Sequence, residues 1–225
     1  FALGRELQEA VQGCQGPRPL RIAIGLADVV PKIVAQKLLI PLLVQPDPVQ
    51  IVCREDRPER LLTELSLQEL DLVLSDSPAT QAEHGRIGVH ALDECSVSVF
   101  GTSALRRAHA RKFPRSLDGA PMLLPTPGTV LRRAMDRWFF SLRIRPRIVG
   151  EFDDSALLKS FGQAGVGLFV APSGVEEEIC HQFGVRVVGR IESIRERFYL
   201  LALESRLRNP AIAAVLESAR SGIWR

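Results

Sequence analysis

Residues 147–178 constrain the fold more than any other stretch, because strand-like and helix-like patterns alternate there with visible boundaries. Ile148 and Val149 form a short apolar strand. This strand stops at Asp153 and Asp154, and either carboxylate can cap the backbone N–H groups at the start of a following helix. The stretch therefore opens with a strand that leads directly into a helix, whose inward face is predicted to consist of Ala156, Leu157, Ser160 and Phe161.

The second half of this stretch repeats the pattern. Gly165 can adopt the left-handed conformation that ends a helix. The apolar run 166–170 is short enough to be a buried strand, and Pro172 closes it. Ser173 and Glu176 then have the spacing of a capping box, in which each side chain satisfies a backbone donor of the next helix. The whole stretch predicts a parallel β-α-β-α segment.

In such segments the loops at the carboxyl ends of the strands face a crevice in which ligands bind. The loop here carries Asp153 and Asp154 and lacks the G-x-G-x-x-G pattern of a dinucleotide site. Gly165 and Gly167 follow the helix instead of opening it, so we interpret them as a helix stop and a close strand contact. A nucleotide is not expected, and both a ligand-binding role and a mere helix-start role for the two aspartates stay open.

The rest of the chain shows the same alternation twice. Strand patterns at 20–25, 49–53 and 71–74 alternate with helices that begin near Pro31 and Pro58. Two strand-like runs without a helix between them follow at 87–100, and further strands are predicted at 122–124, 185–188 and 197–203. Helices are expected after Ser103, Thr129 and Asn209, each of which can cap a helix. The sequence thus predicts an α/β fold of two Rossmann-like lobes joined by two crossing strands.

The two crossings set the expected boundaries. Strands near residues 96 and 198 carry the chain from one half to the other. We therefore predict the end of a linker helix and a linker at 1–19, a first lobe from 20–96 plus 199–225, and a second lobe from 97–198. The final helix is expected to turn Ile212, Val215, Leu216 and Trp224 toward a core.

Composition narrows the class of protein. The 225 residues are 46% hydrophobic and 24% charged, as in ordinary globular proteins. Prolines interrupt the longest apolar runs before they reach membrane-spanning length, and the first residues lack a signal-peptide pattern. The scattered cysteines lack C-x-x-C spacing, which favours reduced thiols in a cytoplasmic protein without a structural metal; they are Cys14, Cys53, Cys95 and Cys180.

Charge and histidine content bear on two further functions. The net charge of +3 is too small to indicate nucleic-acid binding by this chain. One basic cluster could contact bent DNA or could be a solvated helix face, and it comprises Arg106, Arg107, Arg111 and Lys112. Enzyme motifs such as G-x-S-x-G and H-E-x-x-H are absent, and we expect surface roles for the histidines, which are His84, His90, His109 and His181. We therefore expect neither catalysis nor a cofactor.

Several strings together resemble the effector-binding domain of LysR-type transcriptional regulators, over about residues 20–224. They are LRIAIGLADVVP, RLLTELSLQELDLVLSD, SLDGAPMLLPTPGT and SFGQAGVGLFVAPSGVEEE. Within that family, ADVVPKIVAQKLL and VGEFDDSALLKSFGQAG are similar to the NhaR subgroup, whose members regulate sodium/proton antiporters. The resemblance implies a fold like that of type II periplasmic binding proteins, with an effector cleft between the lobes.

The resemblance also implies partners and site residues. A DNA-binding helix-turn-helix would precede this chain, which would keep the last turns of a dimerising linker helix at 1–12. We expect DNA contact only through that motif, assembly as a homodimer or homotetramer, no membrane contact, and a small-molecule or ion effector. By resemblance, residues from four loops line the cleft, and these are Leu26, Ala27, Asp28, Val29, Ser75, Asp76, Thr126, Phe152 and Asp153.

This sequence departs from relatives that sense organic acids by placing Asp28 opposite Asp153. Two facing carboxylates repel an organic anion and offer oxygen ligands to a sodium ion or a proton. Together with the resemblance to the NhaR subgroup, this implies a sodium- or pH-responsive activator of an antiporter gene. Two alternatives stay open: Asp28 can instead cap the helix that begins near Pro31, and a similar architecture serves solute-binding proteins for small molecules.

Overall fold

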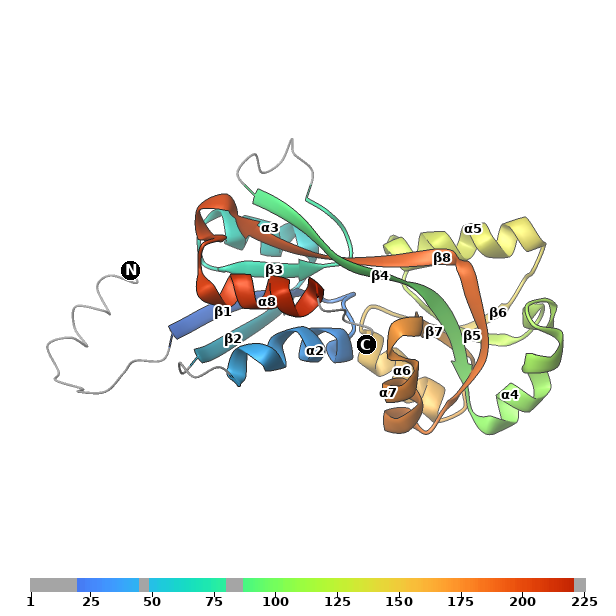
Figure 1. Ribbon diagram of the computed structural model, residues 1–225. Helices are drawn as coiled ribbons and strands as arrows, with labels where there is room; N and C mark the ends of the chain where they lie inside the picture. The colour runs from blue at the N-terminus through green and yellow to red at the C-terminus, as the bar shows by residue number, and fades with distance from the viewer. Residues whose placement is uncertain (1–19, 45–48, 80–86, 221–225) are drawn as a thin grey trace, which may run out of the picture.

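The computed structural model describes residues 20–44, 49–79 and 87–220 (Figure 1). The predicted linker helix and Trp224 lie outside these residues. In chain order the first half contains β1 (Leu20–Ala27), α2 (Lys32–Leu43), β2 (Val49–Asp56), α3 (Pro58–Ser66) and β3 (Leu72–Ser75). The long strand β4 (Ile87–Gly101) then leaves this half.

The second half follows β4 and ends with the return of the chain. It contains α4 (Ser103–His109), two short 3₁₀ turns (Ala110–Lys112 and Arg115–Leu117), β5 (Pro121–Pro125), α5 (Val130–Leu142), β6 (Arg147–Phe152), α6 (Ser155–Gln163), β7 (Phe169–Pro172) and α7 (Glu176–Phe183). The strand β8 (Arg186–Leu203) returns to the first half, where α8 (Pro210–Arg220) packs beside α2.

Strand pairing gives an α/β fold with a mixed sheet. Six strands follow the order β2-β1-β3-β8-β4-β7, in which β1 is parallel to β2 and β3, and β8 is antiparallel to β3 and β4. The parallel pair β5–β6 forms a second sheet. Figure 1 shows β4 and β8 running side by side from one half to the other. The predicted α/β class and the two crossing strands are confirmed, whereas the exact lobe boundaries at 96 and 198 stay a prediction.

The segment 147–178 folds as its pattern indicated. Backbone bonds of 2.7 and 2.8 Å join Leu168 to Leu123 and Pro121, so residue 168 continues into β7 beside β5, in parallel with it. Gly165 has a φ of +78°, the left-handed conformation expected at the end of α6. The parallel β-α-β-α arrangement is therefore confirmed.

The buried apolar side chains form two hydrophobic cores. The larger core joins β1, β3, α2, α3 and α8 and continues through Phe100 and Phe169 toward α7. The smaller core lies under α5 and includes Met122, Met135 and Ile191. Each core buries the apolar face of helices against strands, and such burial is worth about 25 cal/mol per Å². No helix in the described part of the chain is long and apolar enough to cross a membrane.

Four local predictions were wrong. Thr102, and not Ser103, caps α4 by accepting a bond from Leu105 N. Ser173 and Glu176 form no capping box, because Glu176 accepts hydrogen bonds from Ser98 and Arg190 instead. Strand β4 is one element where two runs were expected, and β8 joins the runs 185–188 and 197–203. The two long strands stay continuous because backbone hydrogen bonds between β4 and β8 pair them through their polar middle sections.

The inward face of α6 also differs from the prediction. Leu158, Lys159 and Gly162 are buried, whereas Leu157 and Phe161 are 50% and 43% exposed. Asp154, one of the two aspartates that could cap this helix, does so with its Oδ1 accepting bonds from Ala156 N and Leu157 N. The buried face of the helix includes Lys159.

Candidate functional site

A cavity lies where the two halves meet, with an empty volume of about 540 Å³ that includes its open mouth. The first half contributes the residues that follow β1 and β3, and the second half contributes the ends of β5 and β6, the first turns of α5 and α6, and parts of β7 and β8. The lining residues are Val29, Pro31, Asp76, Pro125, Thr129, Leu131, Phe152, Asp153, Ser155, Leu158, Lys159, Val170, Ala171, Pro172 and Glu196.

The structure brings some of the predicted site residues to this cavity. Val29, Asp76, Phe152 and Asp153 line it. The other predicted residues lie in the walls behind the lining or beside it: Leu26 and Asp28 are half-buried, Ala27 and Ser75 are buried, and Thr126 is half-buried after β5. Four of the nine predicted residues therefore line the cavity, and the effector-binding role of all nine stays a prediction.

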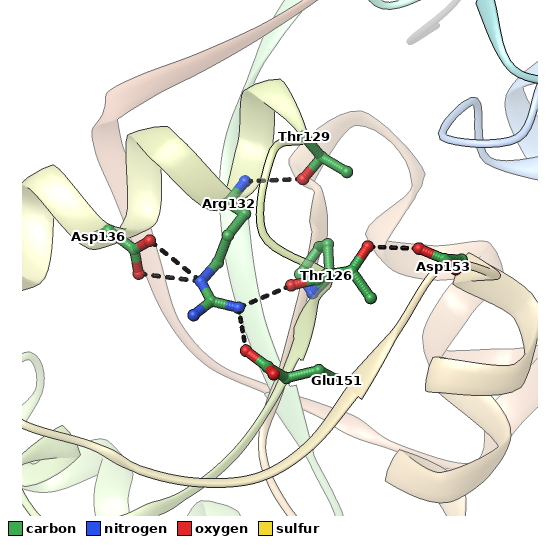
Figure 2. Close-up of polar contacts among 7 residues, drawn as sticks. Thr126, Thr129, Arg132, Asp136, Glu151 and Asp153 are labelled. Atoms are coloured by element: carbon green, nitrogen blue, oxygen red, sulfur yellow. Dashed lines mark hydrogen bonds and ion pairs between the residues drawn. The ribbon is translucent and has the colours of Figure 1, made fainter.

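Thr126 positions Asp153, which lines the cavity, through a hydrogen bond. Its hydroxyl donates a hydrogen bond to Asp153 Oδ1 (Figure 2). Its backbone N also donates to Phe152 O at 3.1 Å. These two bonds join the ends of β5 and β6. They hold the Asp153 carboxylate at the cavity wall.

Arg132 holds together the chain segments that form this wall of the cavity. This arginine is only 8% exposed, and its guanidinium donates to Pro125 O at 2.9 Å, to Glu151, and to Asp136 at 3.0 and 3.1 Å (Figure 2). Thr129 caps α5 by accepting a bond from Arg132 N at 3.1 Å. Charge-assisted bonds of this kind are about twice as strong as neutral ones. The network therefore keeps the loop between β5 and α5 in place.

Lys159 is a site residue that sequence reasoning missed. Its side chain is buried, and Nζ donates to Ser155 O at 3.0 Å. Burial lowers the pKa of Lys159 to about 8, although the nearby carboxylate of Glu196 opposes this shift. The string LLKSFG held no clear signal, because a lysine among apolar residues is ordinary in an amphipathic helix.

Glu196 was also missed. It lies in β8, within the stretch RIESIRE that has no strand-like apolar pattern. Its Oε2 is buried and has no hydrogen-bond partner among the described residues. Burial raises the pKa of Glu196 to about 8, the charge of Asp76 adds to the increase, and Lys159 opposes it. Ser155 Oγ, which also belongs to the cavity lining, is likewise buried without a partner in the described chain.

The two remaining acidic groups, Asp28 and Asp76, interact electrostatically with Asp153 and Glu196, respectively. Burial raises the pKa of Asp28, a hydrogen bond from Val29 N lowers it, and the charge of Asp153 raises it further. Burial also raises the pKa of Asp76, with a contribution from the charge of Asp28. Each carboxylate thus makes its neighbour easier to protonate, as expected for like charges in one site.

The next feature of the site is its set of possible metal ligands. Within the part of the chain that the structure describes, no three or more His, Cys, Asp or Glu side chains are grouped so that they could hold a metal ion. A divalent metal such as Zn²⁺ or Ca²⁺ normally requires such a group.

Comparison with known proteins places the chain in a family. The family of the LysR substrate binding domain matches residues 16–223. This chain belongs to that LysR family. It is an effector-binding regulatory domain with the fold of the type II periplasmic binding proteins, as the resemblance of its sequence implied. The prediction that it is not an enzyme is confirmed, because its relatives are transcriptional regulators.

The LysR relatives show how far the similarity extends. The chain is 28% identical over 224 residues to the "Transcriptional activator protein NhaR" of Escherichia coli, covering all of this chain and 73% of that protein. The regulatory domain of HypT from Salmonella typhimurium superposes with a TM-score of 0.68 at 13% identity, over 94% of this chain and 99% of that one. A putative LysR family transcriptional regulator from Pseudomonas aeruginosa superposes with a TM-score of 0.72 at 16% identity. The superposition covers 98% of this chain and 81% of that one.

Proposed function

We propose that this LysR domain senses its effector in the cavity between the two halves and transmits binding as a change in how those halves close. The cavity supports this proposal, because its lining comes from both halves and from β8, which joins them. A ligand that touches both halves binds the closed state more tightly than the open state. It can shift the equilibrium only by that difference in affinity.

We further propose that the effectors are protons and sodium ions, which compete for this cavity. The observation that carries this proposal is the pair of Glu196 and Lys159, two ionisable groups of opposite charge within one cavity. The pKa of each is about 8. Above pH 8, Glu196 gains a negative charge while Lys159 loses its positive charge, so the cavity attracts a cation more strongly.

The other cavity carboxylates strengthen this attraction. Asp76 and Asp153 line the cavity, and Asp28 lies close enough for its charge to interact with both. A sodium ion at any of these oxygens competes with protons there, and the raised pKa of Asp76 and Asp28 makes this competition stronger. Sodium affinity is therefore expected to rise with pH.

A small organic acid is the second candidate effector. Below pH 8 the cavity contains a charged Lys159 and a protonated Glu196, and Ser155 adds a hydroxyl without a partner among the described residues. These groups can all donate hydrogen bonds to a carboxylate. Apolar side chains such as Leu131 and Leu158 would contact the remainder of such a molecule. The affinity for an organic acid would fall as pH rises.

The wider function follows from the proposed effector. We propose a cytoplasmic activator of a sodium/proton antiporter gene, whose DNA-binding motif lies outside this chain. We also propose a homodimer or homotetramer. Two helices support this assembly: α2 exposes Ile40 (46%) and Leu43 (51%), and α6 exposes Leu157 and Phe161. Apolar stripes of this kind pair well across a two-fold axis.

The opposite pH dependences of the two candidates decide between them. We would measure melting temperatures of the 225-residue chain at about pH 6.5 and about pH 9 in sodium chloride, choline chloride and choline benzoate of equal ionic strength. The proposal predicts stabilisation by sodium over choline that is larger at the higher pH. Asp76→Asn should reduce this stabilisation, and Glu177→Gln, at an exposed carboxylate outside the cavity, should not.

Two results would contradict the sodium proposal. One is stabilisation by benzoate at the lower pH without any difference between sodium and choline, which would identify an organic acid as the effector class. The other is an equal response to sodium in the wild type and in Asp76→Asn, which would place sodium binding elsewhere.

A further inference from the structure

The second half of the molecule carries an unusual excess of positive charge. Residues 101–150 contain eleven Lys and Arg side chains but only two acidic ones, Asp118 and Asp136, whereas the whole chain has a net charge of +3. One of the eleven, Arg132, is buried in the network behind the cavity. The other ten are exposed, namely Arg106, Arg107, Arg111, Lys112, Arg115, Arg133, Arg137, Arg143, Arg145 and Arg147.

These ten cations differ from most of those elsewhere in the described chain. None of them forms an ion pair with a described carboxylate, whereas eight cations outside this stretch do, including Lys37 with Glu178 and Arg190 with Glu176. The two acidic residues of the stretch are already engaged, because Asp136 binds Arg132 and Asp118 accepts a bond from Arg145 N. The charge of the ten exposed cations is therefore not neutralised locally.

Six of these cations gather at one end of the molecule, which we call the basic end. Arg111, Lys112 and Arg115 lie in the 3₁₀ turns after α4. Arg143 and Arg145 lie between α5 and β6, and Arg147 is the first residue of β6. Three backbone-anchored bonds hold the two segments together: Gly119 N to Arg145 O (2.9 Å), Arg145 N to Asp118 Oδ1 (2.8 Å) and Arg147 N to Ala120 O (2.9 Å). In Figure 1 both segments lie at the end farthest from β1 and β2.

We infer that the basic end is a sequence-independent contact for the phosphate backbone of duplex DNA, in addition to the DNA-binding motif that lies outside this chain. Five of its six cations are arginines, whose planar guanidinium groups bind phosphate oxygens through two parallel hydrogen bonds. Phosphate contacts release condensed counterions from DNA and require no apolar anchor. The choice of DNA as partner rests on the proposed function as a transcriptional regulator.

The salt dependence of DNA binding tests this inference directly. We would measure binding of the 225-residue chain to a fluorescent duplex of arbitrary sequence between about 20 and 200 mM KCl. The wild type is expected to bind weakly, with log K falling linearly against log [KCl]. Replacing Arg143, Arg145 and Arg147 by Gln together should make that slope shallower by about 2 to 3 and weaken binding about tenfold or more at the lowest salt.

A second triple variant provides the control. Arg21→Gln, Arg57→Gln and Arg208→Gln remove the same charge from exposed cations of the first half that also lack ion pairs in the described chain. This variant should keep the wild-type slope, because the lost charges lie away from the basic end. Both triple variants should keep the wild-type melting temperature, and the basic-end variant should keep the sodium stabilisation, so a failure of this inference is separable from a failure of the proposed function.

Four outcomes would overturn the inference. The wild type binds no DNA at about 20 mM KCl, or both triple variants lose equal affinity. Alternatively, the basic end binds polyglutamate as tightly as it binds DNA, which would indicate an acidic protein partner. Finally, Phe140→Ser weakens DNA binding as much as the basic-end triple; Phe140 is 86% exposed in α5, and such a loss would indicate docking through an apolar contact.

Discussion

At the scale of single residues, the cavity depends on two ionisable groups that are not recognisable as site residues from sequence. Lys159 and Glu196 lie in different elements and are 37 positions apart, and neither belongs to a motif. Their pairing depends on which face of α6 is buried and on the path of β8. Asp76 and Asp153, in contrast, were predictable because both follow the carboxyl end of a strand.

The raised pKa of Glu196 should be visible in the pH dependence of the free energy of unfolding. The folded protein keeps the Glu196 proton up to a pKa of about 8, whereas the unfolded chain loses it near the ordinary value of 4.5. Between these two values the folded state binds more protons, so the free energy of unfolding falls as pH rises. Glu196→Gln removes this dependence because glutamine resembles the protonated acid.

Urea denaturation at several pH values measures this effect. Between about pH 5 and pH 8 the wild type should lose on the order of 3 kcal/mol more than Glu196→Gln. Equal pH profiles for the two proteins would show that Glu196 is ionised throughout this range. Glu192→Gln, at an exposed position four residues earlier in β8, is the matched control and should follow the wild-type profile.

At the scale of elements, helix α6 illustrates what the sequence pattern could and could not predict. The position of the helix and its glycine end were predicted from Asp153, Asp154 and Gly165. Its buried face was not, because small and apolar residues surround the helix on several sides and the three- and four-residue spacing fits more than one face. The long strands β4 and β8 were divided in two because their middle sections are charged.

The packing of α6 on β7 gives an element-scale prediction. Gly162 is buried, and a Cβ at this position would lie 2.2 Å from Cδ1 of Phe169, which stacks on Phe100 at 5.4 Å. Gly162→Ala should therefore lower the free energy of unfolding by about 2 kcal/mol, although alanine favours helix by about 1 kcal/mol. The midpoint of urea denaturation measures this change. Gln163→Ala, at an exposed position of the same helix, should be neutral or stabilising, and a Gly162→Ala protein as stable as the wild type would contradict this packing.

At the scale of the whole molecule, the α/β class and the two crossing strands were predictable from the order of strand and helix patterns. That order is a local property, since each strand and cap is encoded within a few residues. The cavity was predictable only as a location, because its lining combines loops, helix starts and the middle of β8, which are distant in sequence. Electrostatic interactions such as that of Asp76 with Glu196 depend on how the halves meet, and no local pattern encodes this.

The central claim is that sodium and protons compete for the cavity between the halves, and proton release on addition of sodium tests it most directly. A weakly buffered solution of the 225-residue chain at about pH 7.5 would receive sodium chloride or choline chloride, and a pH-stat would record the protons released. Because Glu196 is mostly protonated just below its pKa of about 8, sodium should displace up to about one proton per chain, and choline none. Glu196→Gln should release far fewer. No release from the wild type, or equal release from both proteins, would contradict the claim.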